Sequence, residues 1–216
     1  MAARFRALCA RSRASAARWA SIIVFALVLA GCAAPMPRTE DPAARQAFDE
    51  RAEVVKAFDE WRLAARLGLS TETEYWSAQL NWRVQQERHV LDLSGPMGRG
   101  GGRLTLAPNQ PAVLVTRAGE QYQAEDPDAL VAYLTNESIP VSGMRYWVRG
   151  LLAPGADYDL ETDEDGLPRR IEQSGWVIEF GEFDEVDGIA LPVRMDLERE
   201  GVELRVRIAN WHMATR

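Results

Sequence analysis

The sequence predicts a mainly β fold with some helix, an incomplete antiparallel β-barrel whose short helices cover an apolar cavity. After residue 64, apolar and polar residues alternate with a period of two in successive short segments. Turn-forming residues separate these segments, and two short helical patterns interrupt them midway. A long antiparallel sheet with one apolar face tends to curl or close, because closure covers that face and removes exposed edges.

A targeting segment precedes this body. Five arginines and no acidic residue come before an apolar run from Trp19 to Ala30, and Leu29-Ala30-Gly31-Cys32 follows. The run is about a dozen residues, whereas a membrane-spanning helix needs about 20. Residues 1–31 are therefore predicted to be a lipoprotein signal peptide, with Cys32 as the acylated N-terminus of the mature chain. The alternative is an ordinary secreted protein whose cysteine falls at this place by chance.

Residues 32–42 contain three prolines and are predicted to be a flexible tether, which leaves residues 43–216 as one domain. Loss of the signal's five arginines would lower the formal net charge from −7 to −12. This acidity argues against nucleic acid as a partner and against electrostatic adhesion to an anionic membrane. Cys9 would leave with the signal, so no thiol would remain for a disulfide, a catalytic nucleophile or a zinc site.

The first element of the body is a helix predicted over residues 43–63, where apolar residues are spaced for one face that packs on the core. Strands are predicted next, and Trp76 to Val84 shows the clearest alternation. The other strands of this half are predicted around residues 89–93, 104–106, 113–115 and 121–124, with turns at 94–102, 109–111 and 117–120.

Two short helices are predicted in the middle of the chain. Asp126 precedes Pro127 as an N-cap, leading into a helix over 129–134. Ser142 is predicted to cap a second helix that runs through Trp147 and stops at Gly150. Strands then resume around residues 158–160, 169–174, 176–180, 191–197 and 202–208, and Asp187-Gly188 is a strong hairpin signal.

Motifs for catalysis are few, so no enzyme is predicted. His89 and His212 are far apart in sequence and lack neighbours at metal-ligand spacing, so both are predicted to be strand residues and no metal or cofactor is expected. Gly98 to Gly102 lacks the lysine and the Ser/Thr of a phosphate-binding loop, which favours a flexible hairpin. The acidic run 161–166 lacks the frame of a calcium loop, which favours a solvated turn.

Six tryptophans remain in the predicted mature chain. Each one alone is explained by core packing, but together they also suit the wall of an apolar cavity for long aliphatic chains. Strand parity, together with the position of Trp147 on its helix, predicts the inner wall to include Leu80, Trp82, Leu91, Leu93, Leu104, Trp147, Trp176, Ile178, Val193, Met195, Leu204 and Val206.

The chain resembles the LolB family of outer-membrane lipoprotein receptors over nearly all of the predicted mature part. Besides the Leu-Ala-Gly-Cys tail, which resembles the bacterial lipobox, the resemblance is carried by Ala78-x-Leu80-x-Trp82, Leu91-x-Leu93-Ser94-Gly95-Pro96-Met97-Gly98, Gln121-Tyr122-x-Ala124, Ile139-Pro140-Val141, Trp147-Val148-x-Gly150, Gln173-x-Gly175-Trp176, Leu191-Pro192 and Asn210-Trp211.

This resemblance implies a LolA/LolB-like half-barrel on the periplasmic face of the outer membrane. It would act as a monomer that accepts lipoproteins from the carrier LolA, binds their acyl chains and inserts them into the membrane. In the family an apolar residue at a hairpin tip helps delivery, and Pro96, Met97 and Gly98 match that loop here, with methionine in place of leucine. Two alternatives remain, a lipid-binding or lipid-sensing lipoprotein without insertion activity and a structural lipoprotein with a filled core.

Overall fold

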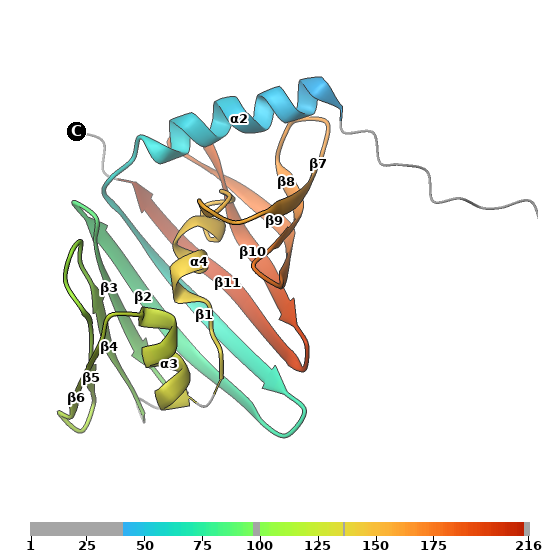
Figure 1. The fold of residues 1–216 in the computed structure, drawn as a ribbon. Helices are drawn as coiled ribbons and strands as arrows, with labels where there is room; N and C mark the ends of the chain where they lie inside the picture. Colours follow the sequence, from blue (N-terminus) through green and yellow to red (C-terminus); the bar gives the residue numbers. More distant parts are fainter. Residues whose placement is uncertain (1–40, 97–99, 136, 214–216) are drawn as a thin grey trace, which may run out of the picture. The chain divides into compact units, whose positions relative to one another are not determined.

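An eleven-stranded antiparallel sheet, which curves around helix α4, dominates the computed structural model of the chain (Figure 1). The structure describes residues 41–96, 100–135 and 137–213, all of which belong to the unit formed by residues 40–216. The predicted signal peptide and Cys32 lie outside the described residues, as does the predicted tether up to residue 40.

The strands follow one another in space in the order β6-β5-β4-β3-β2-β1-β11-β10-β9-β8-β7. Chain neighbours therefore pair in two meanders, which β1 and β11 join at the centre of the sheet. The strands are β1 (Trp61–Thr71), β2 (Tyr75–Gln85), β3 (Arg88–Ser94), β4 (Gly101–Leu106), β5 (Ala112–Thr116), β6 (Gln121–Ala124), β7 (Tyr158–Thr162), β8 (Pro168–Gln173), β9 (Trp176–Val186), β10 (Ile189–Arg199) and β11 (Val202–Met213). The sheet ends at β6 and β7 without closing, so the prediction of an incomplete antiparallel barrel is confirmed.

Tight turns set the register of the hairpins. Asp187 (φ 50°) and Gly188 (φ 80°) both have positive φ, as a two-residue hairpin turn of type I′ requires. Ser174 and Gly175 join β8 to β9 with the same signs of φ. These turns keep the apolar residues of successive strands on one face, because a slip of one residue would reverse every side chain.

Three helices accompany the sheet in the described residues: α2 (Pro42–Lys56), α3 (Pro127–Thr135) and α4 (Val141–Trp147). Helix α2 begins at an Asp41 cap and lies across one end of the sheet (Figure 1). Its half-buried Arg51 donates hydrogen bonds to the carbonyl oxygens of Ala190, Gly150 and Arg149 at 2.7–3.1 Å. These bonds fasten α2 to β10 and to the chain after α4.

The predicted extent of the first helix was wrong. The helix ends at Lys56 rather than near Leu63, and Trp61 begins the central strand β1. Val54, Phe58 and Trp61 have helical spacing, but Trp61, Leu63, Ala65, Leu67 and Leu69 also alternate, and all five are buried. Pairing of this segment with both β2 and β11 favours the extended conformation.

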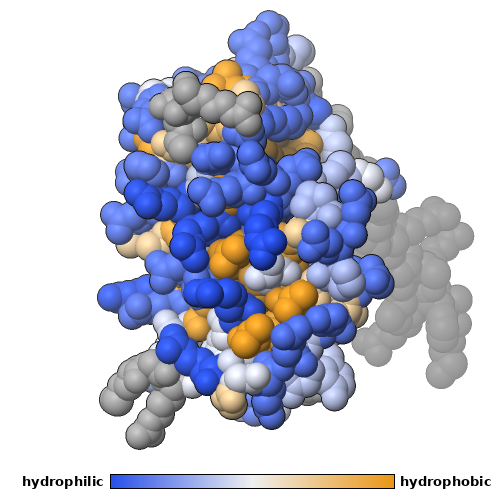
Figure 2. Space-filling view, turned by 90° about the vertical axis from the view of Figure 1, so that its left-hand side faces the viewer, coloured by the Kyte–Doolittle hydropathy of each residue, from blue (hydrophilic) through white to orange (hydrophobic). Residues whose placement is uncertain are grey.

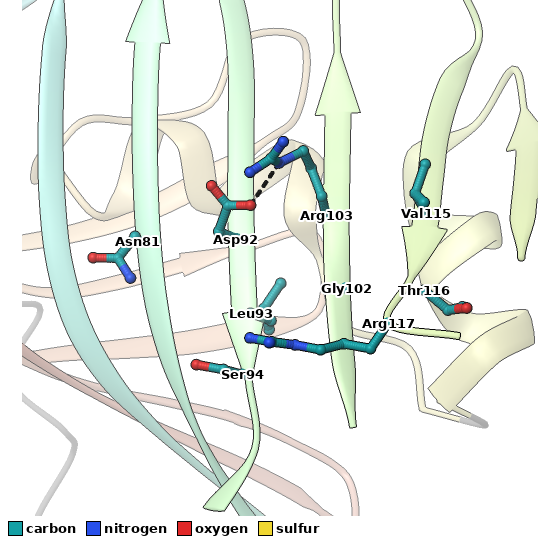
Figure 3. Close-up of a pocket in the computed structure, with 9 residues that line it drawn as sticks. All are labelled: Asn81, Asp92, Leu93, Ser94, Gly102, Arg103, Val115, Thr116 and Arg117. Atoms are coloured by element: carbon teal, nitrogen blue, oxygen red, sulfur yellow. Dashed lines mark hydrogen bonds and ion pairs between the residues drawn. The ribbon is translucent and has the colours of Figure 1, made fainter. Parts of the chain in front are cut away.

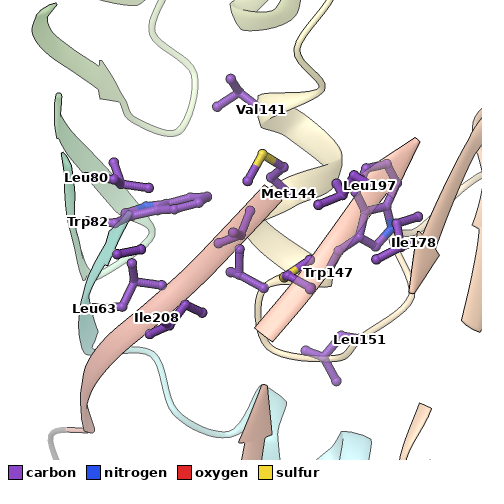
Figure 4. Close-up of a cluster of buried hydrophobic side chains, with 14 of the residues drawn as sticks. Leu63, Leu80, Trp82, Val141, Met144, Trp147, Leu151, Ile178, Leu197 and Ile208 are labelled. Atoms are coloured by element: carbon purple, nitrogen blue, oxygen red, sulfur yellow. The ribbon is translucent and has the colours of Figure 1, made fainter. Parts of the chain in front are cut away.

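The core lies between the inner face of the sheet and helices α2 and α4. Trp82, Trp147 and Trp176 are among its largest fully buried side chains. Figure 4 shows Trp82 facing α4 from the sheet, and Met144 and Trp147 projecting from α4 into the cluster. Within the described residues, none of the helices has the length and apolar character needed to cross a bilayer.

Candidate functional site

An apolar pocket of about 450 Å³ lies between the first half of the sheet and the α3–α4 segment. None of the described side chains that line it is charged, and among them Ser77 and Thr116 supply the only hydroxyl groups. The lining residues are Leu67, Trp76, Ser77, Ala78, Leu80, Leu93, Gly95, Pro96, Gly101, Gly102, Leu104, Leu114, Thr116, Val131, Ile139, Val141, Met144 and Leu204. Such a lining suits an aliphatic ligand, since a polar group buried there would lack hydrogen-bond partners.

Helices α3 and α4 form the side of the pocket opposite the sheet, and a carboxylate joins them. The Asp126 side chain accepts the Asp128 N–H at 2.9 Å, so the predicted cap of α3 is confirmed. Asp128 in turn accepts a hydrogen bond from the backbone N–H of Ser142 at 2.9 Å and another from its hydroxyl. The prediction that Ser142 caps α4 was therefore wrong, because Ser142 lies inside the helix and its own N–H donates to a carboxylate from α3.

Four of the twelve residues predicted for the inner wall line this pocket: Leu80, Leu93, Leu104 and Leu204. Seven others do not line the pocket and are buried in the core: Trp82, Leu91, Trp147, Trp176, Ile178, Met195 and Val206. Val193 stands at a β-bulge between Pro192 and Arg194 and is only half-buried. Contact between any of these residues and an acyl chain stays a prediction.

Two of the tryptophans are held by specific hydrogen bonds inside the core. The Trp82 Nε1–H donates to Nδ1 of His89 at 3.2 Å, and the Trp147 Nε1–H donates to Oε1 of Gln173 at 2.9 Å. Burial lowers the pKa of His89 from 6.5 to about 4, and the charges of Arg145 and Arg149 lower it further in the same direction. A neutral His89 keeps Nδ1 free as the acceptor, so this end of the core is fixed by polar as well as apolar contacts.

The wall residues that lie outside the long strands were not predicted from the sequence. Leu114 comes from the short strand β5, Val131 from α3, and Ile139 from the link to α4. Short elements show too few periods for their buried side to be assigned. Only the Ile139-Pro140-Val141 motif of the family resemblance drew attention to this region.

The predicted insertion loop begins at the rim of the pocket. Pro96 lines the pocket and is exposed, whereas Met97 and Gly98 lie outside the described residues. The far side of the hairpin requires glycine, because a Cβ on Gly101 would come within 2.3 Å of the Leu93 carbonyl oxygen. A Cβ on Gly102 would similarly come within 2.6 Å of the Val115 carbonyl oxygen. The base of the loop is therefore packed closely against β3 and β5.

An open antiparallel sheet that holds an apolar pocket under two helices is typical of a carrier or receptor for apolar ligands. Its fold is shared with solved structures at low sequence identity. A LolA superfamily protein from Nitrosomonas europaea aligns with a TM-score of 0.52 and 8% identity, over 82% of this chain and 96% of that one. A DUF1329 family protein from Desulfovibrio piger aligns with a TM-score of 0.51 and 10% identity, over 82% and 95%.

Sequence comparison identifies the family. The model of the family described as outer membrane lipoprotein LolB matches residues 59–211. The outer-membrane lipoprotein LolB of Alkalilimnicola ehrlichii is 38% identical over 190 residues, which cover 88% of this chain and 94% of that protein. The protein of the same name from Halorhodospira halophila is 38% identical over 191 residues, covering 88% and 92%. The chain therefore belongs to the LolB family.

Proposed function

We propose that this chain is an outer-membrane receptor that accepts lipoproteins from a LolA-like periplasmic carrier and inserts them into the outer membrane. The acyl chains of the cargo would occupy the pocket between the sheet and helices α3 and α4. The observation that carries this proposal is the pocket itself, which has a volume of about 450 Å³ and no charged side chain among the described residues of its wall.

Transfer of acyl chains needs neither a nucleotide nor a covalent step. Burial of each methylene contributes about 0.8 kcal/mol to the binding free energy of an acyl chain. A small difference per methylene between the cavities of carrier and receptor therefore adds up to a large difference in binding free energy over the whole acyl chain. Within the described residues, no group of three or more His, Cys, Asp or Glu could hold a metal ion. Membership of the LolB family supports a transport protein rather than an enzyme.

The acylated Cys32 would keep the receptor, as a monomer, on the periplasmic face of the outer membrane. A single acyl chain holds a protein only marginally, whereas a triacylated cysteine exceeds the two chains that stable attachment requires. Anchoring raises the effective concentration of the pocket beside the bilayer that receives the cargo.

Delivery would use the Pro96-Met97-Gly98 loop. Pro96 already borders the pocket, so an apolar Met97 next to it could lead an acyl chain from the pocket into lipid. Met97→Glu should leave loading from the carrier intact and impair delivery to outer-membrane vesicles, because a carboxylate resists entry into the hydrocarbon region. Delivery at the wild-type rate would contradict this role, and a loss of loading would assign Met97 to the carrier interface.

The pocket is tested by filling it. Leu114→Trp places a large ring into the pocket, while Val115→Trp, its matched control on the same strand, points to the outer face. Leu114→Trp should weaken the binding of a fluorescent sixteen-carbon fatty acid at least about tenfold, since the ring occupies the volume that the chain needs. Val115→Trp should bind the probe as the wild type does.

The outcomes also separate the alternatives. If neither the wild type nor the control binds the fatty acid, the structural lipoprotein with a filled core is the better interpretation. If the wild type binds the fatty acid but forms no crosslink with a LolA-like carrier, the protein is a lipid-binding or lipid-sensing lipoprotein without insertion activity.

A further inference from the structure

The outer face of the first half of the sheet is strongly basic. Six arginines lie on β1 to β5 or directly after β5, all are exposed, and their strand parity directs them away from the core. We call this surface the arginine face, and it consists of Arg62, Arg66, Arg83, Arg88, Arg103 and Arg117. Asp92 is the only acidic residue within these five strands.

The other half of the sheet has the opposite charge. Strands β7 to β10 contain 9 acidic residues and 4 arginines. The formal net charge of −7 therefore conceals a basic surface on one half of the sheet. Segregation of this kind creates a local potential that the net charge does not report.

The arginine face places like charges directly opposite each other. Arg62 pairs in register with Arg83, and Arg66 pairs in register with Arg207 of β11. Like charges at directly opposed positions destabilise a sheet. Ion pairs with aspartates neutralise one member of each pair, Arg83 and Arg207, so Arg62 and Arg66 keep their charge for an external anionic partner.

Internal counter-ions are scarce on this face. Asp92 accepts ion pairs from both Arg83 at 3.2 Å and Arg103 at 2.6 Å. Across the part of the chain that the structure describes, Arg62, Arg66, Arg88 and Arg117 form no ion pair. Most of the positive charge of the arginine face is thus available to a partner.

Figures 2 and 3 show how these side chains lie. Figure 2 views the molecule from the side that β3 to β6 form in Figure 1 and shows a mainly hydrophilic surface with small apolar patches. In Figure 3, Arg103 turns toward Asp92, and Arg117 extends across Gly102 toward Ser94. These residues line a shallow hollow of about 330 Å³ together with Val115, which is 37% exposed.

We propose that the arginine face docks onto the anionic phospholipid headgroups of the bilayer to which the chain is anchored. At most about 3.6 Å per residue, the nine residues from Cys32 to Asp41 hold the domain within a few tens of ångströms of that bilayer. Lipid phosphates form a continuous anionic surface. Such a surface can contact six arginines spread over this half of the sheet, whereas a single small anion could contact only a few of them. Tyr75, at the start of β2, is 70% exposed, and a tyrosine at this place suits the headgroup region.

The docking surface would give the anchored domain a fixed orientation. The lipid anchor alone restricts distance, whereas a basic surface adds a second contact that restricts rotation. The inference relies on the outer-membrane location proposed above but not on acyl-chain binding. Vesicle binding without cargo therefore tests it separately from the proposed function.

The experiment measures sedimentation of residues 40–216, which contain the whole sheet, its helices and the core, with lipid vesicles. Vesicles of phosphatidylethanolamine with about 30% phosphatidylglycerol should bind the domain at low salt, and neutral phosphatidylcholine vesicles should bind it much less. Raising the salt to about 0.3 M should weaken the binding to anionic vesicles at least about tenfold.

The triple variant Arg62→Gln, Arg66→Gln, Arg117→Gln removes three arginines that form no internal ion pair and should reduce binding to anionic vesicles at least about tenfold. Its matched control, Arg169→Gln, Arg170→Gln, Arg194→Gln, removes the same charge from the acidic half and should bind as the wild type does. The thermal midpoint of each variant shows that it is folded.

Binding without preference for anionic lipid, or full binding by the arginine-face variant, would overturn the proposal. It would also be overturned if that variant kept its vesicle binding but lost transfer from a LolA-like carrier in solution. The arginine face would then be a protein-docking surface instead.

Discussion

At the scale of single residues, the buried His89 makes stability depend on pH. The unfolded chain takes up a proton at His89 near its ordinary pKa of 6.5, whereas the folded chain does so only near pH 4. The free energy of unfolding should therefore fall as the pH falls from about 6.5 to about 4. A shift of this size corresponds to about 3 kcal/mol over the whole window and about 2 kcal/mol between pH 7 and pH 5.

His89→Gln keeps a side-chain acceptor for the Trp82 Nε1–H but cannot take up a proton. In urea unfolding at pH 7 and pH 5, this variant should lose about 2 kcal/mol less between the two pH values than the wild type. The matched control is His212→Gln, because His212 is the chain's other histidine and is exposed in the folded chain. Equal pH dependence in all three proteins would show that His89 is not the cause.

At the scale of elements, the sequence predicted the strands after residue 75 because each has a clear alternation and a turn signal at its end. The start of strand β1 was wrongly assigned to the first helix, since Trp61 also has helical spacing from Val54 and Phe58 and only the pairing with β2 and β11 decides between the two. The pocket wall from α3 and α4 was missed for a related reason. Its position depends on tertiary contacts, such as the one between Asp128 and Ser142, that no local pattern encodes.

The Asp128–Ser142 contact couples helices α3 and α4 over the pocket. Asp128→Ala removes the acceptor of the Ser142 N–H and hydroxyl, and it should lower the free energy of unfolding by about 1–3 kcal/mol. Amide exchange should become faster in both helices, and a bound fatty acid should dissociate faster because the helices separate from the sheet more often.

Asp126→Ala is the matched control for the coupling of the two helices. It removes the cap of α3 but leaves the link to Ser142 in place, so exchange should rise in α3 and not in α4. If Asp128→Ala affects α3 alone, the carboxylate is a local cap and does not join the two helices.

At the scale of the whole molecule, the two halves of the sheet differ in packing as they do in charge. The pocket lies against β1 to β5 and Leu204 of β11, whereas β8 to β10 provide fully buried residues such as Ile171, Leu191 and Leu197. Net charge and total apolar content are averages over both halves, so neither could reveal this division from composition. We infer that the second half supplies most of the stability and that the first half can hold a ligand.

This division predicts that a Leu→Ala substitution lowers the free energy of unfolding by different amounts in the two halves of the sheet. Leu197→Ala should lower the free energy of unfolding by about 2–5 kcal/mol, because it opens a cavity in a fully packed core. Leu93→Ala should cost less than about 2 kcal/mol, since Leu93 borders the pocket and has fewer packing partners to lose. In contrast, Leu93→Ala should change the affinity for a fatty acid, and Leu197→Ala should leave it unchanged where the protein is folded. Urea unfolding and fluorescent fatty-acid titration measure the two effects separately. Equal destabilisation by the two variants, with unchanged affinity in both, would contradict a division between a stabilising half and a ligand-holding half.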